Sequence, residues 1–500
     1  MTAQSFDLLV IGGGIHGAAV ARDAAGRGLK VMLAEKGDYA SATSSASSKL
    51  VHGGLRYLER LEFGLVRESL VERAQLLKGA PHLVTPVRFL LPIYRWQRRQ
   101  AMALRAALAL YDALSFGDGL PASGRLDDDD IVQLPRLRQE ELVSVLHYCD
   151  CMTDDSRLTL AVLLDARARG ADIKNRRAVT AIGALANGYA AELDERGEKR
   201  RVEARFIVNA AGPFVAEVDA MTPKAPPPRA LTLVRGSHIV LPMPAPAHAD
   251  AYTLQDEEER VVFVLPWLDQ RFLIVGTTDV PHEGSLSEPL CSADEKAYLL
   301  AAYNRYFAGP SGPATEADIV HTWSGLRALH DEEGLAPSRI SRSPALSITA
   351  NGTGGFVTLY GGKLTTHRAL AGDVLEALLR LGAEAGGAWT KDAPLHGGTL
   401  PLPELLDRAA LGPAGISDAM RRRWALTYGD QIDVLFGRVG ADPDQAREIA
   451  PGITRAELEH AVEVEDAMTP EDFLLRRTKL HLTLDERGRK AVARWFKFGA

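Results

Sequence analysis

A glycine-rich turn between an apolar strand and a helix of small residues constrains this chain more than any other feature. The strand reads Leu8-Leu9-Val10-Ile11, and Gly12-Gly13-Gly14-Ile15-His16-Gly17 follows it. In this G-x-G-x-x-G pattern the glycines permit a tight turn, let a pyrophosphate approach the backbone, and let helix and strand pack closely. A second apolar strand, residues 31–34, ends on Glu35, whose carboxylate can accept hydrogen bonds from a ribose diol. The pattern predicts a Rossmann-type dinucleotide site, for NAD or FAD, formed by Gly12, Gly13, Gly14, Gly17 and Glu35.

Length and composition describe an acidic globular protein with several domains. Five hundred residues suffice for two or three domains, and 46% apolar with 25% charged residues is typical of soluble enzymes. A net charge of −7 gives no support to nonspecific nucleic-acid binding, so no nucleic-acid partner is predicted. The N-terminus lacks the basic start of a signal peptide, and no apolar run reaches the roughly eighteen residues of a transmembrane helix. Three cysteines form neither a disulfide framework nor a metal spacing, so we expect reduced thiols and no metal.

Residues 41–57 crowd small hydroxyl side chains together and end in a Gly53-Gly54 turn followed by Arg56 and Tyr57. A flexible surface loop would carry less apolar and cationic material, so these polar groups are predicted to face a ligand. The periodicity of residues 63–78 then predicts a helix that ends near Gly79.

Residues 88–114 are basic and apolar together. Leu104, Leu108 and Tyr111 share one helical face, and Trp96 stands among Arg95, Arg98 and Arg99 like an interfacial anchor. An ordinary packed helix is the alternative. If the segment lies on a membrane, the apolar face is expected to meet lipid and the arginines to meet anionic headgroups.

Later segments alternate between the nucleotide-binding fold and an antiparallel sheet. Residues 178–182 and 206–209 read as strands of the first, and the pair 261–265 and 272–275 reads as a hairpin of the second. From 405 onward the pattern is helical. We expect an α/β fold in which residues 1–404 interleave a nucleotide-binding domain (mainly 1–80, 150–225 and 340–385) with a cap domain (mainly 81–149 and 229–335), followed by a helical domain at 405–500.

Seven segments in this order resemble the FAD-dependent, respiratory glycerol-3-phosphate dehydrogenases. They are IGGGIHGAAVARDAAGRGL (11–29), ATSSASSKLVHGGLRYLE (42–59), GSHIV (236–240), VFVLPW (262–267), VGTTDV (275–280), WSGLRAL (323–329) and GGKLTTHR (361–368). The resemblance covers nearly the whole chain, and SSKLVHGGLRYLE is its most specific part. The family turn N-A-x-G-P-W carries Phe214 here in place of tryptophan, which leaves Gly212 unchanged.

The resemblance implies FAD bound by a glutathione-reductase-like fold, with an antiparallel-sheet cap domain over the flavin. It implies oxidation of sn-glycerol 3-phosphate to dihydroxyacetone phosphate by hydride transfer from carbon 2 to FAD, with electrons passed to a membrane quinone. Carried over from the family, the cofactor-binding residues are Thr43, Ser44, Ser47, Ser48, Lys49, Val179, Gly212, Gly362, Lys363 and Leu364.

The chemistry of this reaction points to further residues. A phosphorylated secondary alcohol needs cations at one end and a proton acceptor at the other, and arginine grips phosphate oxygens in pairs. The candidates for substrate binding are Arg56, Tyr57, His238, Arg327, Arg342 and Lys363, and the candidates for catalysis are His52, His238, Arg327 and Lys363. A histidine, His52 or His238, suits the proton acceptor, whereas Arg327 suits stabilisation of the developing alkoxide or a place close to the proton transfer.

Three alternative functions differ from this one in the electron acceptor, in the substrate or in the absence of catalysis. A glycerophosphate oxidase would use oxygen, an amine or hydroxy-acid oxidoreductase of the same fold would need fewer cations, and a non-catalytic flavoprotein would bind FAD that no substrate reduces. For the dehydrogenase, we expect a peripheral protein on the cytoplasmic face of the inner membrane, contacting anionic lipid. The sequence leaves open a homodimer.

Overall fold

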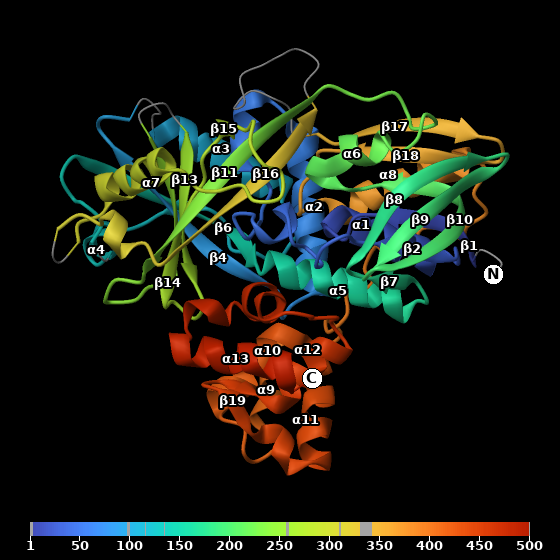
Figure 1. Ribbon diagram of the computed structural model, residues 1–500. Coiled ribbons are helices and arrows are strands. Elements are labelled where there is room, and N and C mark those ends of the chain that lie inside the picture. The colour runs from blue at the N-terminus through green and yellow to red at the C-terminus, as the bar shows by residue number, and fades with distance from the viewer. Residues whose placement is uncertain are drawn as a thin grey trace.

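The computed structural model describes residues 4–97, 101–115, 117–134, 136–256, 260–309, 312–330 and 343–499. Figure 1 shows two sheets side by side, with the C-terminal helices gathered below them. Strands of each sheet come from segments far apart in the sequence. Among the described residues, no helix combines the length and the apolar character needed to cross a bilayer.

The first sheet has eight described strands, and its central path runs β17-β18-β10-β1-β2-β7. Pairing is parallel from β18 to β7, and β17, β9 and β8 extend the sheet in antiparallel pairs. The strands are β1 (Gln4–Ile11), β2 (Val31–Ala34), β7 (Asp172–Lys174), β8 (Arg177–Leu185), β9 (Gly188–Glu195), β10 (Glu198–Asn209), β17 (Ala345–Asn351) and β18 (Gly354–Tyr360). Helix α1 (Ile15–Gly26) packs between α5 (Asp155–Ala168) and α8 (His367–Arg380). Buried alanines in α1 allow this close packing.

The second sheet has ten described strands and is mainly antiparallel, with one parallel pair between β4 and β12. Its strands are β3 (Leu50–Val51), β4 (Val84–Tyr94), β5 (Gly124–Arg125), β6 (Leu142–Thr153), β11 (Leu231–Pro242), β12 (Ala251–Gln255), β13 (Val261–Trp267), β14 (Phe272–Gly276), β15 (Val280–Pro281) and β16 (His321–His330). The predicted hairpin is β13–β14. The helices of this half are α2 (Phe63–Gly79), α3 (Ala101–Leu114), α4 (Asp128–Val132) and α7 (Ala293–Tyr306).

Helix α3 corrects one sequence-based expectation. The face predicted to meet lipid carries Leu108 and Tyr111, which are only 2% and 1% exposed and pack into the core beneath the second sheet. Trp96 is not a free interfacial anchor either, because it stacks on Tyr94 at 5.7 Å between ring centroids and lies 3.8 Å from the Arg305 guanidinium. Burial removes more apolar area from water than an interfacial position would. Of the predicted cations, 98 and 99 lie outside the described residues.

The C-terminal helices are α9 (Leu402–Ala410), α10 (Asp418–Tyr428), α11 (Ile432–Ala441), α12 (Arg455–Glu463), a π-helix at Asp472–Arg477 and α13 (Glu486–Phe498), with a small hairpin of β19 (Glu448–Ala450) and β20 (Ile453–Thr454). They attach to the first half through buried ion pairs. Asp38, which follows β2, accepts from Arg476 at 2.5 Å and from Arg477 at 2.7 and 2.8 Å. Arg157 of α5 pairs with Glu465 at 2.6 Å. The C-terminal helices are therefore joined to the nucleotide half by charge as well as by apolar packing.

Candidate active site

Four turns of the predicted cofactor site meet at one edge of the first sheet. Strands β18, β10, β1 and β2 run parallel, so the segments that follow them leave the same edge. Those segments are 361–364, 210–213, 12–14 and 35–37. The carboxyl edge of a parallel sheet is where open α/β folds bind their ligands. The topology thus brings together the predicted residues Gly12, Glu35, Gly212 and Gly362.

The glycine fingerprint has the shape that a pyrophosphate requires. Gly12 has φ +111°, and a Cβ there would lie 2.7 Å from the Ala210 carbonyl oxygen. A Cβ on Gly17 would lie 2.0 Å from the Gly12 oxygen. At the start of α1, the Ile15 amide donates to Ser44 Oγ at 2.9 Å, which places Ser44 beside the helix N-terminus. These residues form a bare backbone cradle at a helix N-terminus, where an anionic phosphate is favoured.

Two backbone amides hold the Glu35 carboxylate in place. Its Oε2 accepts from the Gly13 amide and its Oε1 from the Gly37 amide, both at 2.6 Å. Burial raises the pKa of this carboxyl, and the two backbone hydrogen bonds oppose that rise. The Arg177 amide at the start of β8 donates to the Glu35 carbonyl at 2.8 Å, so the strand that carries Val179 lies nearby. The ribose and adenosine contacts of Glu35 and Val179 remain predictions.

An acidic residue that sequence reasoning missed anchors the hydroxyl-rich segment. Asp155, in the first turn of α5, accepts from the Ser47 hydroxyl and from Lys49 Nζ, each at 2.7 Å. The Lys49 side chain is 3% exposed and points toward this partner. Thr43 donates to the Leu326 carbonyl at 2.7 Å. The segment is thus fastened to α5 on one side and to β16 on the other.

A row of residues across the second sheet links the two candidate histidines. Trp323, His238, Gly276 and Phe263 are register partners on the neighbouring strands β16, β11, β14 and β13. Directly paired residues point to the same face of a sheet. The rings of His238 and Trp323 stack at 5.1 Å, and the ring of His52 meets Phe263 edge-on at 6.4 Å. A Cβ on Gly276 would lie 2.0 Å from His238, so the glycine leaves the space that this imidazole fills.

The surroundings of His238 disfavour its protonated form. Burial, followed by the positive charges of Arg327 and Lys49, holds its pKa well below the usual value. Its Nε2 lies 2.9 Å from Ser48 Oγ, which ties the imidazole to the hydroxyl-rich segment. His238 is only 2% exposed, whereas His52 is half-buried.

Arg327 lies on the same face of β16 as Trp323, four residues further along. It donates to Asp279 Oδ1 at 2.6 Å, to the Thr278 carbonyl at 3.2 Å and to Thr277 Oγ1 at 3.3 Å. Asp279 was not among the predicted residues. These partners fix the guanidinium close to the end of β14 and next to the row that contains His238.

Lys363 reaches the other side of the same region. Its Nζ lies 3.8 Å from the centre of the Tyr57 ring, and its carbonyl lies 3.3 Å from His16 Nε2 at the start of α1. Two residues on, Thr365 Oγ1 accepts from the His52 amide at 3.4 Å. The structure therefore brings Lys363, Tyr57 and His52 together. The predicted residue 342 and the side chain at position 56 lie outside the described parts.

Three residues of the site escaped sequence reasoning: Asp155, Asp279 and Trp323. Asp155 lies 106 residues from Lys49 in sequence, and Asp279 lies 48 from Arg327. No local pattern connects such pairs. The one available signal for Asp279 was its place inside the VGTTDV segment.

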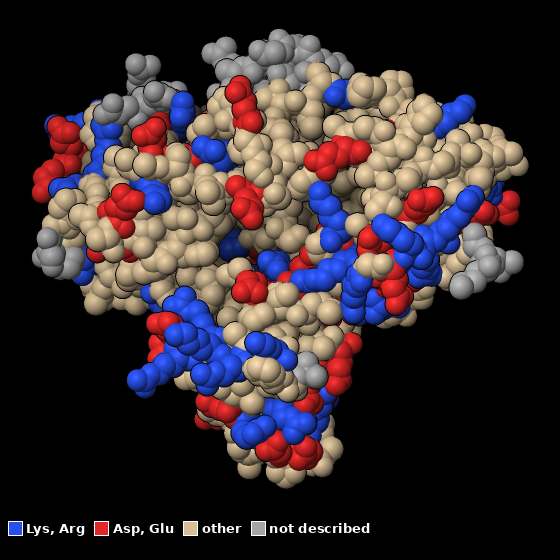
Figure 2. All heavy atoms as spheres, viewed as in Figure 1, with Lys and Arg blue, Asp and Glu red and all other residues tan. Residues whose placement is uncertain are grey.

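A cavity of about 320 Å³ opens where the C-terminal helices meet the two sheets. Figure 2 shows the surface hollowed at this junction. Its walls include Thr43 and Lys49 of the hydroxyl-rich segment, Trp267 and Trp323 of the second sheet, and His481 of the C-terminal part. The cavity lies on the side of the hydroxyl-rich segment that carries Thr43, and Ser44 and Ser48 are not among its lining residues.

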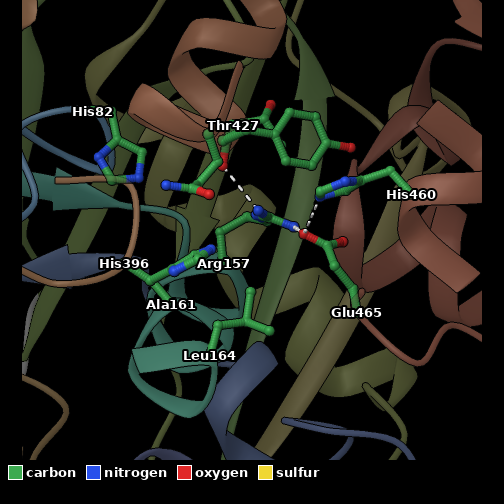
Figure 3. A pocket seen from close by; sticks show the side chains of 10 residues that line it. His82, Arg157, Ala161, Leu164, His396, Thr427, His460 and Glu465 are labelled. Atoms are coloured by element: carbon green, nitrogen blue, oxygen red, sulfur yellow. Dashed lines mark hydrogen bonds and ion pairs between the residues drawn. The ribbon is translucent and has the colours of Figure 1, made fainter. Parts of the chain in front are cut away.

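A second, much smaller cavity lies at the contact between α5 and the C-terminal helices. Figure 3 shows His82, His396 and His460 around the ion pair of Arg157 with Glu465. Burial lowers the pKa of His82 to about 3 and also lowers the pKa of the other two imidazoles. The volume of this cavity, about 10 Å³, admits about one water molecule. In the described part of the chain, no group of His, Cys, Asp or Glu has an arrangement that could hold a metal ion. We therefore interpret this small cavity as a packing gap at the junction between α5 and the C-terminal helices.

Comparisons with known proteins agree with this architecture. The model of the FAD dependent oxidoreductase family matches residues 7–368, and that of the C-terminal domain of alpha-glycerophosphate oxidase matches residues 388–498. A glycerol-3-phosphate dehydrogenase of Pseudomonas aeruginosa is 41% identical over 96% of this chain and 93% of its own length. The aerobic glycerol-3-phosphate dehydrogenase of Escherichia coli is 39% identical over 98% and 97%. D-erythritol 1-phosphate dehydrogenase of Brucella abortus is 39% identical over 99% and 98%.

Among solved structures, the glycerol-3-phosphate dehydrogenase from Bacillus halodurans complexed with FAD superposes with a TM-score of 0.78. It is 28% identical and covers 99% of this chain and 91% of that one. The predicted α/β fold with a helical C-terminal part is confirmed, and FAD is the cofactor. The glycine turn at residues 12–17, the half-buried Glu35 after β2 and the similarity to these relatives all point to FAD binding. The chain belongs to the family of FAD-dependent glycerol-3-phosphate dehydrogenases.

Proposed function

We propose that this protein oxidises sn-glycerol 3-phosphate to dihydroxyacetone phosphate and delivers the electrons to a membrane quinone. The proposal rests on a series of neighbouring residues that connects Lys363, His52 and Arg327 beside the carboxyl edge of the first sheet. Thr365, next to the Lys363 turn, holds His52, and the His52 ring meets Phe263. Phe263 pairs with Gly276, which precedes the Thr277 that Arg327 contacts. An anionic alcohol fits this combination of cations and imidazole.

FAD, when bound, supplies the acceptor for the two electrons and the hydrogen on carbon 2. Lys363 binds the phosphate of the substrate, together with the predicted arginines at 56 and 342. Arg327 stabilises negative charge on the oxygen of carbon 2, since a guanidinium keeps its proton at neutral pH. His52 accepts the hydroxyl proton. His238 suits this task less, because its Nε2 engages Ser48 and its ring is buried against Trp323.

The phosphate end alone does not choose between substrates. A relative named for D-erythritol 1-phosphate is as similar to this chain as the Escherichia coli enzyme, at 39% identity. Both substrates present a phosphate and a secondary alcohol to the same cations. D-erythritol 1-phosphate is therefore the competitor against which sn-glycerol 3-phosphate has to be compared.

The test is anaerobic mixing of the purified, FAD-loaded protein with each substrate while the flavin absorbance is followed. We expect rapid bleaching by sn-glycerol 3-phosphate, slower bleaching by D-erythritol 1-phosphate, and almost none by glycerol, which lacks the charge that the cations bind. Flavin that sn-glycerol 3-phosphate leaves oxidised would refute the proposal. If the flavin is reduced, its reoxidation by a quinone analogue rather than by oxygen would indicate a dehydrogenase rather than an oxidase.

A quinone in the bilayer requires a membrane contact, and the outward face of α3 fits it. Leu108 and Tyr111 face the core, yet the opposite side of this helix is also apolar. It exposes Met102 at 78% and Leu110 at 40%, together with alanines at 103, 106, 109 and 113, and Arg105 is exposed among them. Leu61, which follows the short 3-10 helix Leu55–Arg60 that contacts α3, is 72% exposed. Contiguous exposed apolar surface marks an interaction site, so we propose that this face dips into the headgroup region on the cytoplasmic side of the membrane.

A further inference from the structure

We propose that Tyr111 and Asp150 are positioning residues that fix the backbone at Gly53 and thereby aim the imidazole of His52. The inference rests on the proposed function, because it concerns the residue to which we assign the proton transfer. His52 precedes Gly53 directly, so the orientation of the peptide that joins them sets the direction of the imidazole.

The contacts converge on one amide. The Gly53 N–H lies 2.9 Å from Tyr111 Oη and 3.4 Å from Asp150 Oδ1. Tyr111 donates its own hydroxyl hydrogen to Asp150 Oδ2 at 2.7 Å. Arg73 donates to Asp150 and, at 3.2 Å, to the carbonyl of Cys149. Tyrosine, carboxylate and guanidinium are each at most 2% exposed.

The direction of these hydrogen bonds is determined by the protonation of the phenol. Burial, and then the charge of Asp150, raise the pKa of Tyr111 well above its ordinary value, so the hydroxyl stays protonated. Its single hydrogen goes to the carboxylate, which leaves an oxygen lone pair for the Gly53 N–H. The amide therefore has a defined acceptor at the depth of the core, where losing a partner is costly.

The loop also fits tightly against its acceptor. A Cβ on Gly53 would lie 2.5 Å from Tyr111 Oη and 2.4 Å from Leu70, so the backbone lies directly on these side chains. On the other side, the His52 amide donates to Thr365 Oγ1 at 3.4 Å. Two successive amides are thus held by opposite walls, one from α3 and β6 and one from the turn before α8. Displacement of either wall rotates the peptide that carries the imidazole.

Burying a guanidinium and a carboxylate is expensive compared with apolar packing of the same volume. Tyr148 is a neighbouring buried tyrosine with no contact to the Gly53 amide. Its ring lies 6.0 Å from the ring of Tyr111, it is 3% exposed, and its hydroxyl forms a hydrogen bond with Thr253. The distinguishing feature of Tyr111 is its contact with the amide beside His52. Tyr148→Phe is therefore the matched control for Tyr111→Phe, since both remove one buried hydroxyl from the same cluster.

The first experiment measures hydrogen–deuterium exchange in the peptide that spans residues 50–58 of the FAD-loaded protein. Tyr111→Phe removes the nearer acceptor of the Gly53 amide and leaves only Asp150 Oδ1, at 3.4 Å. Exchange there should therefore accelerate at least tenfold, while Tyr148→Phe should leave it unchanged. This readout needs no substrate and does not depend on the proposed reaction. Equal protection of this peptide in the wild type and Tyr111→Phe would overturn the inference.

The second experiment measures steady-state turnover of sn-glycerol 3-phosphate with a soluble dye as electron acceptor, together with the rate of flavin bleaching in a single turnover. A misaimed base slows the chemical step more than binding, so we expect Tyr111→Phe to lower kcat about tenfold or more, with KM within about twofold and FAD content unchanged. Tyr148→Phe should keep the wild-type rate even if its Tm falls equally. Thr365→Val, which removes the opposite contact, should also lower kcat. A normal rate in Tyr111→Phe sinks the inference, whereas an unreactive wild type would count against the proposed substrate and leave the exchange result to decide.

Discussion

Replacing two exposed residues on α3 tests the membrane proposal directly. We predict that the double variant Met102→Glu, Leu110→Glu moves the protein from the membrane fraction to the soluble fraction. Both side chains point away from the core, so the fold should tolerate the change. The face that carries Leu108 and Tyr111 stays intact.

The magnitude follows from exposure. Complete burial of a methionine or leucine side chain is worth about 1.5 to 3 kcal/mol. Exposures of 78% and 40% amount to slightly more than one whole side chain available to lipid, or about 2 kcal/mol by that scale. Two new carboxylates near anionic headgroups add repulsion of about 1 kcal/mol each. The total of about 4 kcal/mol corresponds to roughly a thousandfold weaker partition into the bilayer.

The assay is sedimentation with vesicles containing anionic lipid, combined with two activity measurements on the same samples. In the double variant, both membrane binding and quinone reduction should decrease. Reduction of a soluble dye by sn-glycerol 3-phosphate should persist. Leu411→Glu is the matched control, because Leu411 is 87% exposed and lies at the end of α9. That variant should bind vesicles like the wild type.

Full vesicle binding and full quinone reduction by the double variant would refute the assignment of α3. Attention would then pass to α13, whose outward face exposes lysine and arginine side chains and Phe498, at 77%. Figure 2 shows such cations gathered over the C-terminal helices.

Three further perturbations probe the cofactor, the substrate and the domain junction. Gly12→Ala places a Cβ against a carbonyl oxygen at 2.7 Å, so the purified variant should lose its yellow flavin; normal FAD content would contradict the cradle. Arg327→Ala should lower kcat/KM for sn-glycerol 3-phosphate by roughly 10- to 150-fold, from about 1.5 to 3 kcal/mol, without loss of FAD; an unchanged kcat/KM would remove it from the site. Burial raises the pKa of Asp38, but Arg477 and Arg476 together hold it well below the ordinary value. Their stabilisation is therefore complete above the unfolded pKa of about 4 and is lost as pH falls, so Asp38→Asn should lower Tm at pH 7 and flatten the acid dependence.

The cofactor fingerprint is an example of what the sequence determines without help. The spacing of Gly12, Gly14 and Gly17 encodes a turn whose geometry involves residues close together in the chain, with Glu35 one strand further on. At Gly12 and Gly17 the structure leaves no room for a Cβ, which is a physical reason for glycine at these two positions. Residue patterns are sufficient for the turn because its own residues are close together in the chain, although the backbone that Gly12 approaches is that of the distant Ala210.

Helix α3 shows where a pattern is ambiguous. Its existence follows from periodicity, but apolar residues stand on both of its sides, so periodicity alone cannot say which side is buried. Leu104, Leu108 and Tyr111 looked like the lipid face, yet Leu108 and Tyr111 are core residues and Met102 with Leu110 are exposed. The choice depends on where α2 and the second sheet lie, which the helix itself does not encode.

The electrostatic partners of the site are the clearest contribution of tertiary structure. Lys49 looked like a cofactor ligand, and the fold pairs it with Asp155; Arg327 meets Asp279; and the amide after His52 finds Tyr111. From the sequence alone, the type of each residue gives only its charge or its capacity to donate a hydrogen bond. The identity of its partner depends on which strands and helices become neighbours, and that is set by burial of apolar surface across the whole chain rather than by either residue.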